Sequence, residues 1–367
     1  MAHDVASIAS HFDLGGEPVA VEPITTGHIN DTYVLTTVSG GRAARYVLQR
    51  INHHVFKDPP RVMENVLRVT RHVRARLGQV DPLLAERQLR VIPTQSNEGC
   101  YRDGDGNFWR AYTYVEKAVT YDTVPSTSLA REAARMFGLF QRLLCDLPAP
   151  PLHETIPGFH DTPRRLERFY QVLRTDALNR AGHAATEIDF VLENAAICAI
   201  LPDLAGKGEF PTRTVHNDTK INNVMLDETT GTGVCIIDLD TVMPGSSVHD
   251  FGDLVRTASC PAAEDERDLS RVAIDAGLFE ALVRGFAEET RRWFTATERD
   301  HLVFGAKIIT FEQMIRFLTD HLAGDLYYKV HREGHNLDRT RTQMKLVQSI
   351  IEQEESLNGF VQRAYCE

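Results

Sequence analysis

Hydrophobic positions are spaced as in strands over roughly the first third of the chain. Five segments rich in β-branched and aromatic residues predict strands: Ala20–Thr25, Thr32–Val38, Arg45–Ile51, Gln88–Thr94 and Phe108–Val115. Ser39-Gly40-Gly41 joins the second and third of these segments, and such residues favour a tight hairpin turn. The first three segments therefore predict an antiparallel meander.

Helical spacing interrupts the strands once and then replaces them. A helix is expected to begin at Pro59-Pro60, because apolar residues recur there every three or four positions. Its apolar stripe consists of Val62, Val66, Val69, Val73 and Leu77. Beyond about residue 116 helical spacing dominates, starting with a helix at Leu129 that Ser128 is expected to cap. The pattern predicts an α+β protein with a small β-rich part and a larger helical part.

Composition and charge narrow the class of protein. A chain of 367 residues with 43% hydrophobic residues can bury two cores, which agrees with two parts. The formal charge of −11, from 40 basic and 51 acidic side chains, disfavours nucleic acids and anionic membranes as partners. Six cysteines without a C-x-x-C pair are interpreted as buried, reduced thiols. Neither a leader nor a membrane span is expected, so we predict a cytoplasmic monomer or small homo-oligomer.

One segment concentrates the side chains that can do chemistry, His216-Asn217-Asp218-Thr219-Lys220-Ile221-Asn222-Asn223. The apolar runs Asn223–Asp227 and Val234–Asp238 follow and predict an antiparallel hairpin. A symmetric register places Asn223 opposite Asp238. Two oxygen ligands at one point suit Mg²⁺, which takes its other ligands from nucleotide phosphates and water. Asp218, just upstream, can then orient an attacking hydroxyl and accept its proton.

This segment resembles the catalytic loop H-x-D-x-K-x-x-N of protein kinases and of the aminoglycoside phosphotransferase family. The resemblance implies that Asp218 is the catalytic base and that Lys220 steadies the transferring phosphoryl group. It also implies that Asn223 and Asp238 hold Mg²⁺. The downstream residues that resemble an element bracing the loop in that family are Gly245, Asp250, Phe251, Gly252 and Asp253.

A closer resemblance, to the N-acetylhexosamine 1-kinases, extends over nearly the whole chain. It rests on G-H-I-N-D-T-Y at Gly27–Tyr33, F-H-D-T-P at Phe159–Pro163, R-F-L-T-D at Arg316–Asp320, G-D-L-Y-Y at Gly324–Tyr328 and H-N-L-D-R-T-R-T-Q at His335–Gln343. It implies transfer of the γ-phosphoryl group of ATP to the anomeric hydroxyl of N-acetylglucosamine or N-acetylgalactosamine. Residues matching His28, Arg316 and Tyr327 hold the sugar in that family.

The nucleotide site is less well marked in the sequence. Gly27 is a single glycine where protein kinases have three in the loop over the phosphates. Gln49 stands where many kinases have a phosphate-binding lysine, so Arg50 is the candidate cation, although strand alternation points it away from Gln49. The backbone of Val115, Glu116 and Lys117 is expected to bind adenine. Asp240 is either a metal or substrate ligand or a brace of the loop.

These inferences predict a two-lobed, protein-kinase-like fold with a nucleotide-binding N-lobe at residues 1–116. A catalytic and sugar-binding C-lobe is expected at residues 117–367. The predicted activity is an ATP- and Mg²⁺-dependent N-acetylhexosamine 1-kinase, with an amino sugar and a nucleotide as partners. An aminoglycoside, choline or homoserine phosphotransferase is the alternative, and a catalytically silent nucleotide-binding module is disfavoured because Asp218, Asn223 and Asp238 are all present.

Overall fold

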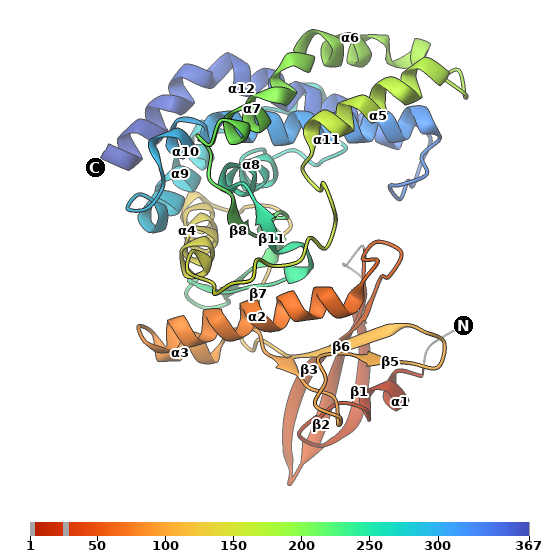
Figure 1. Ribbon diagram of the computed structural model, residues 1–367, viewed down its shortest axis with the longest axis vertical. Helices are drawn as coiled ribbons and strands as arrows, with labels where there is room; N and C mark the ends of the chain where they lie inside the picture. The colour runs from red at the N-terminus through yellow and green to blue at the C-terminus, as the bar shows by residue number, and fades with distance from the viewer. Residues whose placement is uncertain (1–3, 25–28, 367) are drawn as a thin grey trace.

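The computed structural model describes residues 4–24 and 29–366, and its N-terminal part is built on one antiparallel sheet (Figure 1). The strand order is β1-β2-β3-β6-β4, and β5 also pairs with β6. The elements of this part are α1 (Val5–Ala9), β1 (Glu17–Ile24), β2 (Asp31–Ser39), β3 (Arg42–Ile51), α2 (Pro59–Gly78), α3 (Pro82–Glu86), β4 (Val91–Ile92), β5 (Tyr101–Arg102) and β6 (Phe108–Thr113). The predicted meander is confirmed.

The two faces of this sheet belong to different cores, because successive side chains of a strand point to opposite sides. Leu35, Leu48 and Trp109 pack with α1 in a small cluster on one face. Ile51 and Tyr112 join the main core, which continues through α2 into the helical part. The sheet face turned toward α2 is therefore the one that meets the rest of the molecule.

Helix α2 lies between the sheet and the helical part (Figure 1). It starts with the two prolines as expected, and the Asp58 carboxylate caps it by accepting the Arg61 N–H. The predicted stripe from Val62 to Leu77 is buried. On the same helix Asn65 Nδ2 donates to the backbone oxygens of His153, at 2.8 Å, and of Val242, at 3.2 Å. Helix α2 thus connects the sheet to the segment that follows Asp240.

The remaining residues form a mainly helical part with two small sheets, β10-β9-β7 and β11-β8. Its helices are α4 (Thr127–Leu144), α5 (Thr162–Thr175), α6 (Ala185–Asn194), α7 (Ile200–Gly206), α8 (Ser247–Ala258), α9 (Ala276–Thr290), α10 (Ala296–Asp300), α11 (Leu302–Ala323) and α12 (His335–Cys366). Its strands are β7 (Ala118–Val119), β8 (Arg213–Val215), β9 (Val224–Asp227), β10 (Gly233–Ile236) and β11 (Met243–Gly245). The catalytic-loop residues lie between β8 and β9.

Two glycines let helix α8 approach helix α11 closely. A Cβ atom on Gly252 would lie 2.3 Å from the carbonyl oxygen of Gly305, and one on Gly305 would lie 2.3 Å from that of Val248. No side chain fits at those distances, so the crossing depends on glycine in both helices. Asp250 lies on α8 next to this crossing, and the crossing fixes the position of Asp250.

Three local predictions differ from the structure. Only Val91–Ile92 of the expected strand Gln88–Thr94 is a strand, because Pro93 cannot donate to a ladder. Helix α4 starts at Thr127, and its cap is Ser126, whose Oγ accepts the Leu129 N–H at 3.3 Å.

All six cysteines are free, but Cys145 and Cys366 are exposed and not buried as expected. Among the residues the structure describes, no helix combines the length and apolar character needed to cross a membrane.

Candidate active site

The catalytic loop leaves β8, which pairs with β11, and turns at Asn217, whose φ of 65° is left-handed. Asp250 braces this turn: its two carboxylate oxygens accept the backbone N–H groups of His216, at 2.9 Å, and of Asn217, at 2.7 Å. Gln141 Nε2 donates to the same carboxylate at 2.8 Å. Asp250 thus makes the contacts that the bracing role implied by the resemblance requires.

His216 orients the backbone of the next residues. Its Nδ1 accepts the N–H of Asp218 at 3.2 Å, so its proton is on Nε2, which donates to the Ile237 carbonyl at 2.9 Å. Phe137 and Phe140 pack edge-on against the ring. The buried imidazole therefore joins the catalytic loop to the end of the hairpin.

Asp218, Lys220 and Asn223 lie together, as predicted. Lys220 Nζ is 2.9 Å and 3.1 Å from the two carboxylate oxygens of Asp218. Asn223 Nδ2 donates to the Asp218 carbonyl at 2.8 Å and to its carboxylate at 3.3 Å. Burial alone would raise the pKa of Asp218, but the Lys220 ammonium outweighs it and the pKa is lowered. The same attraction raises the pKa of Lys220.

Asp238 reaches this cluster by a different route from the one predicted. The hairpin pairs Ile236 with Val224, and the Ile237 N–H donates to the Asn223 carbonyl at 3.0 Å. Asn223 is therefore opposite Ile237 and not Asp238, one residue away from the symmetric register. Asp238 follows the strand in a left-handed conformation with φ 58°, at the start of the 3₁₀ turn Leu239–Thr241.

The electrostatics around Asp238 favour a cation. Its side chain opens to solvent, yet the surrounding protein displaces enough water to raise the pKa of Asp238 to about 6. Repulsion from Asp240 and Asp218 acts in the same direction. A divalent cation would relieve this repulsion, and its natural ligands are oxygens such as these.

The residues present fit Mg²⁺. The amide nitrogen of Asn223 is used by Asp218, while its Oδ1 accepts no hydrogen bond from any residue in 4–24 or 29–366. Asn223 Oδ1 and the Asp238 carboxylate are thus two available oxygen ligands. Within those same residues, no group of three or more His, Cys, Asp or Glu side chains is arranged to hold a metal ion without other ligands.

Asp240 has the bracing role of the two that the sequence left open. Its carboxylate forms a two-pronged ion pair with Arg110 of β6, with Arg110 Nη2 at 2.9 Å, and both side chains are 1% exposed. Asn30 Nδ2 also donates to Asp240, at 2.8 Å. Because Arg110 and Asn30 both donate to its oxygens, Asp240 links the N-terminal part to the catalytic segment. A metal or substrate role of Asp240 stays a prediction.

Arg50, the predicted phosphate-binding cation, already has partners on the sheet. Arg50 Nε donates to Asp31 at 2.7 Å, and Arg50 Nη1 to Asn107 at 3.3 Å. Its neighbour Gln49 instead accepts from Arg110, so Arg50 lies on the sheet face opposite to Asp240, as alternation indicated. Phosphate binding by Arg50 therefore requires that its ion pair with Asp31 change.

Arg87 holds the backbone of the predicted hinge at Glu116 and Lys117. Arg87 Nη2 donates to the carbonyls of Glu116, at 3.0 Å, and Lys117, at 3.2 Å, and Arg87 Nη1 to Asp227 at 2.9 Å. The connection at Val115, Glu116 and Lys117 is thus attached to the same hairpin that carries Asn223. Adenine binding there stays a prediction.

Of the predicted sugar ligands, His28 lies outside the described residues, as does Gly27 of the phosphate loop. Arg316 is on α11, with its guanidinium carbon 5.9 Å from the centre of the Phe159 ring and 5.7 Å from that of Tyr328. Arg256 lies within electrostatic reach of both Asp218 and Arg316. Arg316 and Asp218 therefore share Arg256 as a neighbouring charge.

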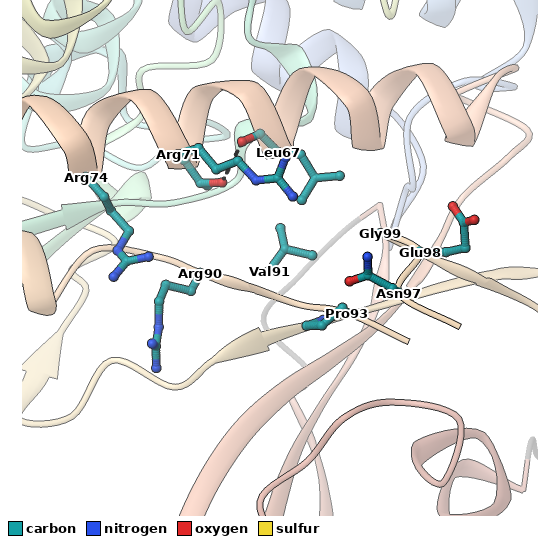
Figure 2. A pocket seen from close by; sticks show the side chains of 10 residues that line it. Leu67, Arg71, Arg74, Arg90, Val91, Pro93, Asn97, Glu98 and Gly99 are labelled. Atoms are coloured by element: carbon teal, nitrogen blue, oxygen red, sulfur yellow. Dashed lines mark hydrogen bonds between the residues drawn. The ribbon is translucent and has the colours of Figure 1, made fainter. Parts of the chain in front are cut away.

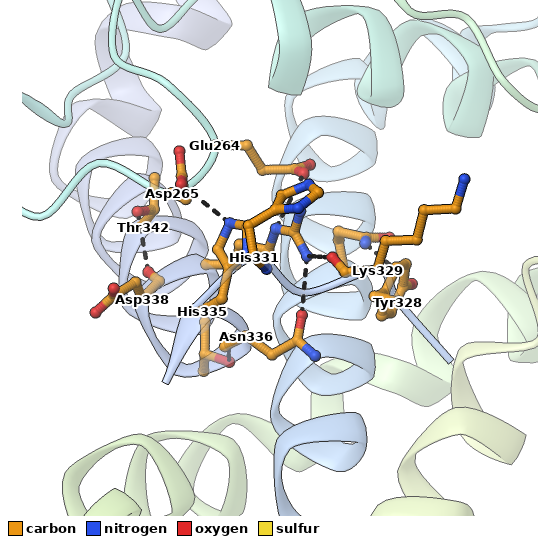
Figure 3. A network of polar contacts seen from close by, with 12 residues as sticks. Glu264, Asp265, Tyr328, Lys329, His331, His335, Asn336, Asp338 and Thr342 are labelled. Carbon is orange, nitrogen blue, oxygen red and sulfur yellow. Dashed lines mark hydrogen bonds and ion pairs between the residues drawn. The ribbon is translucent and has the colours of Figure 1, made fainter. Parts of the chain in front are cut away.

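Tyr327 is 66% exposed on the loop between α11 and α12. Asp320 holds this loop by accepting the backbone N–H groups of Tyr327, at 2.8 Å, and Tyr328, at 3.0 Å. Figure 3 shows the polar network at the end of the loop, where His335 reaches Asp265 at 3.0 Å. The ring of Tyr327 is thus carried on a fixed backbone and is free to contact a ligand.

Sequence reasoning missed a buried ion pair beneath the catalytic loop. His160 Nδ1 is 3.0 Å from Glu312, and His160 Nε2 is 2.9 Å from the Asn217 carbonyl. Burial lowers the pKa of His160, but Glu312 outweighs it and the pKa is raised; in turn His160 lowers the pKa of Glu312 to about 2 against burial. The F-H-D-T-P segment contained His160, but only the fold brings it to Glu312.

We expect Glu312→Gln to destabilise the protein most between about pH 4.5 and 6.5, by about 1–3 kcal/mol. The Glu312 contribution is present above its ordinary pKa and is lost as pH falls toward about 2. The His160 contribution is present below its ordinary pKa and is lost as pH rises through the raised pKa. Urea unfolding at pH 5.5 and pH 8.5 should therefore show a smaller difference from the unmodified protein at the higher pH.

Glu354→Gln is the matched control, because Glu354 pairs with Lys307 at 2.7 Å and lysine does not titrate in this range. Its effect should be equal at the two pH values. An effect of Glu312→Gln that is just as flat would contradict the charged His160–Glu312 pair.

Residues 20–294 match the phosphotransferase enzyme family. An aminoglycoside phosphotransferase from Alicyclobacillus acidocaldarius subsp. acidocaldarius DSM 446 superposes with a TM-score of 0.58 at 16% identity, covering 98% of this chain and 94% of that one. A choline kinase from Cryptosporidium parvum Iowa II gives 0.54 at 15% identity, covering 93% and 91%. A spectinomycin phosphotransferase solved with ADP and spectinomycin gives 0.56 at 11% identity, covering 97% and 98%.

These similarities confirm the α+β, kinase-like fold, with an antiparallel N-terminal sheet and a larger helical part. The family match includes the whole stretch from β2 to α9, and with it the catalytic loop, the hairpin and α8. The chain therefore belongs to the phosphotransferase enzyme family.

Proposed function

We propose that the protein transfers the γ-phosphoryl group of ATP to the anomeric hydroxyl of an N-acetylhexosamine. The observation that carries the reaction type is the cluster of Asp218, Lys220 and Asn223 beside Asp238. Asp218 would orient the sugar hydroxyl and take its proton. An anomeric hydroxyl is more acidic than an ordinary alcohol. A carboxylate with a lowered pKa can therefore accept its proton, provided that the proton moves late in the reaction.

The nucleotide and metal parts of the proposal rest on the same cluster. Asn223 Oδ1 and Asp238 would hold Mg²⁺, which neutralises phosphate charge when bound. Lys220 adds one positive charge beside Asp218, where charge builds up on the transferring group. A relative of the same fold was solved with ADP, which supports ATP as the donor.

The choice of acceptor is supported by the charges near Arg316. Arg165 Nη2 donates to the Phe159 carbonyl at 3.0 Å, its buried Nε has no partner, and Arg316 lowers its pKa in addition to burial. Arg256 is the third guanidinium in this group. Arg256 also pairs with Asp253 and Glu264. Guanidinium groups such as those of Arg316 and Arg165 suit the carbonyl and hydroxyl oxygens of an acetamido sugar, which accept hydrogen bonds.

The direct test is ³¹P NMR of the product after incubation with MgATP and N-acetylglucosamine or N-acetylgalactosamine. A sugar 1-phosphate is expected. Kanamycin, choline and homoserine are tested in parallel, and they should give little product. A phosphomonoester at C6, or faster turnover of kanamycin or choline than of both sugars, would overturn the proposed acceptor but leave the phosphotransferase assignment intact.

We expect Arg316→Gln to raise KM for the sugar by about 10- to 100-fold, since a charged hydrogen bond contributes about 1.5–3 kcal/mol. KM for MgATP should change less than about twofold. Arg168→Gln on the exposed side of α5 removes the same charge and serves as the control. An equal rise in both KM values for Arg316→Gln would show that Arg316 does not act on the sugar.

A further inference from the structure

A cavity lies on the N-terminal part, between α2 and the segment around β4 (Figure 2). Its volume is about 180 Å³. Arg71 and Arg74 come from α2 and Arg90 from the residue before β4, while Leu67, Val91 and Pro93 supply apolar walls. Asn97 and one carboxylate, Glu98, also line the cavity (Figure 2). Leu67, Arg71 and Arg74 share one face of the helix, because they are spaced four and three residues apart.

The three arginines of this cavity have no acidic partner. Among residues 4–24 and 29–366, none of their guanidinium groups makes an ion pair or hydrogen bond. Arg74 Nε is buried without a partner. Burial lowers the pKa of Arg74, and the like charge of Arg90 adds to this effect, so these two guanidiniums are close enough to repel each other.

Other arginines on the same helix behave differently. Arg61 pairs with Asp58, Arg76 pairs with Asp146, and Arg68 donates to the Pro148 carbonyl at 2.7 Å. The protein has 51 acidic side chains for 40 basic ones, so carboxylates are plentiful. A shortage of acidic side chains in the protein therefore does not explain why three guanidiniums at one cavity are unpaired.

We propose that this cavity binds a phosphate-bearing anion. Guanidinium forks donate to the outer oxygens of a phosphate group and offset its negative charge. A volume of about 180 Å³ is enough for a phosphate group and a short organic part. Leu67, Val91 and Pro93 would contact that organic part. The site is separate from Asp218, and the inference does not rest on the proposed sugar kinase activity.

Binding there would also tie α2 to β4. The opposite face of α2 carries Asn65, which holds the Val242 carbonyl. Met63 lies one turn before Leu67 on the cavity's own face, and its sulfur is 3.8 Å from Arg110 Nη1. An anion at the cavity thus stabilises a helix that supports the Arg110–Asp240 pair. A bound anion should raise the thermal unfolding midpoint of the whole protein by mass action.

The test is calorimetric titration of the full chain with inorganic phosphate and with glucose 6-phosphate, at fixed ionic strength. Arg71→Gln/Arg90→Gln is compared with Arg61→Gln/Arg42→Gln, which makes the same change of charge at exposed positions on α2 and β3. The cavity variant should bind at least about tenfold more weakly, and the control variant within about twofold of the unmodified protein. Glucose serves as the uncharged control ligand, and its titration should show no binding that depends on Arg71 and Arg90.

The two anions distinguish the source of the phosphate. Tighter binding of glucose 6-phosphate identifies an organic phosphate ester, and equal binding identifies free phosphate. Phosphate can also meet Lys220, but that binding would persist in the cavity variant. Equal affinity in the two double variants, or no binding by the unmodified protein, would overturn the proposal. Arg71 and Arg90 are exposed, so circular dichroism should show both variants folded.

Discussion

Asp218→Asn is expected to lower kcat by about 10²- to 10⁴-fold, the usual contribution of a positioned general base. The amide has nearly the shape of the carboxylate but cannot take the proton of the acceptor hydroxyl. MgATP affinity should stay nearly unchanged, because the proposed metal ligands Asn223 and Asp238 are untouched. Single-turnover kinetics with a nucleotide titration measures both quantities.

The control for this variant is Asp227→Asn at the far end of the same hairpin, where the carboxylate caps a turn and pairs with Arg87. It should reduce kcat far less than Asp218→Asn. Lost nucleotide affinity with chemistry preserved in Asp218→Asn would contradict the assigned role of Asp218.

Arg110→Met is expected to lower the free energy of unfolding by about 3–5 kcal/mol, the cost of leaving one member of a buried ion pair uncompensated. Asp240 would keep its charge at 1% exposure with only Asn30 donating to it. Because the pair joins the sheet to the catalytic segment, activity should fall as well. Urea denaturation at pH 7 measures the loss.

Arg45→Met is the matched control, since Arg45 pairs with Glu116 in a largely exposed pair. Its cost should be below about 1 kcal/mol. The double variant Arg110→Met/Asp240→Leu removes both charges and should recover part of the stability. A cost for Arg110→Met no larger than that of Arg45→Met would show that the buried pair does not stabilise the fold.

Local patterns were sufficient to predict much of this molecule. The strands of the meander, the start of α2 and the closeness of Asp218, Lys220 and Asn223 depend on residues a few positions apart. The hairpin was predicted, but its register was wrong by one residue, because the hydrophobic pattern of two short strands does not fix where the turn closes or where a bulge falls.

Contacts between distant segments could not be predicted in this way. Arg110 and Asp240 are 130 residues apart, and His160 and Glu312 are 152 apart. The sequence predicted α2 as a helix with an apolar stripe, yet only the fold shows that Arg90 joins Arg71 and Arg74 there. Each of these pairings depends on tertiary packing, for which a single chain gives no local signal.

The crossing of Gly252 and Gly305 makes the chemistry sensitive to residues that never touch a substrate. Alanine normally favours a helix by about 1 kcal/mol over glycine. Here a single methyl group would meet a backbone oxygen at 2.3 Å on either side, so the two helices would have to separate. Asp250 would move with α8 and would no longer hold the turn before Asp218. A glycine-to-alanine substitution, which is harmless in most helices, would therefore abolish activity here.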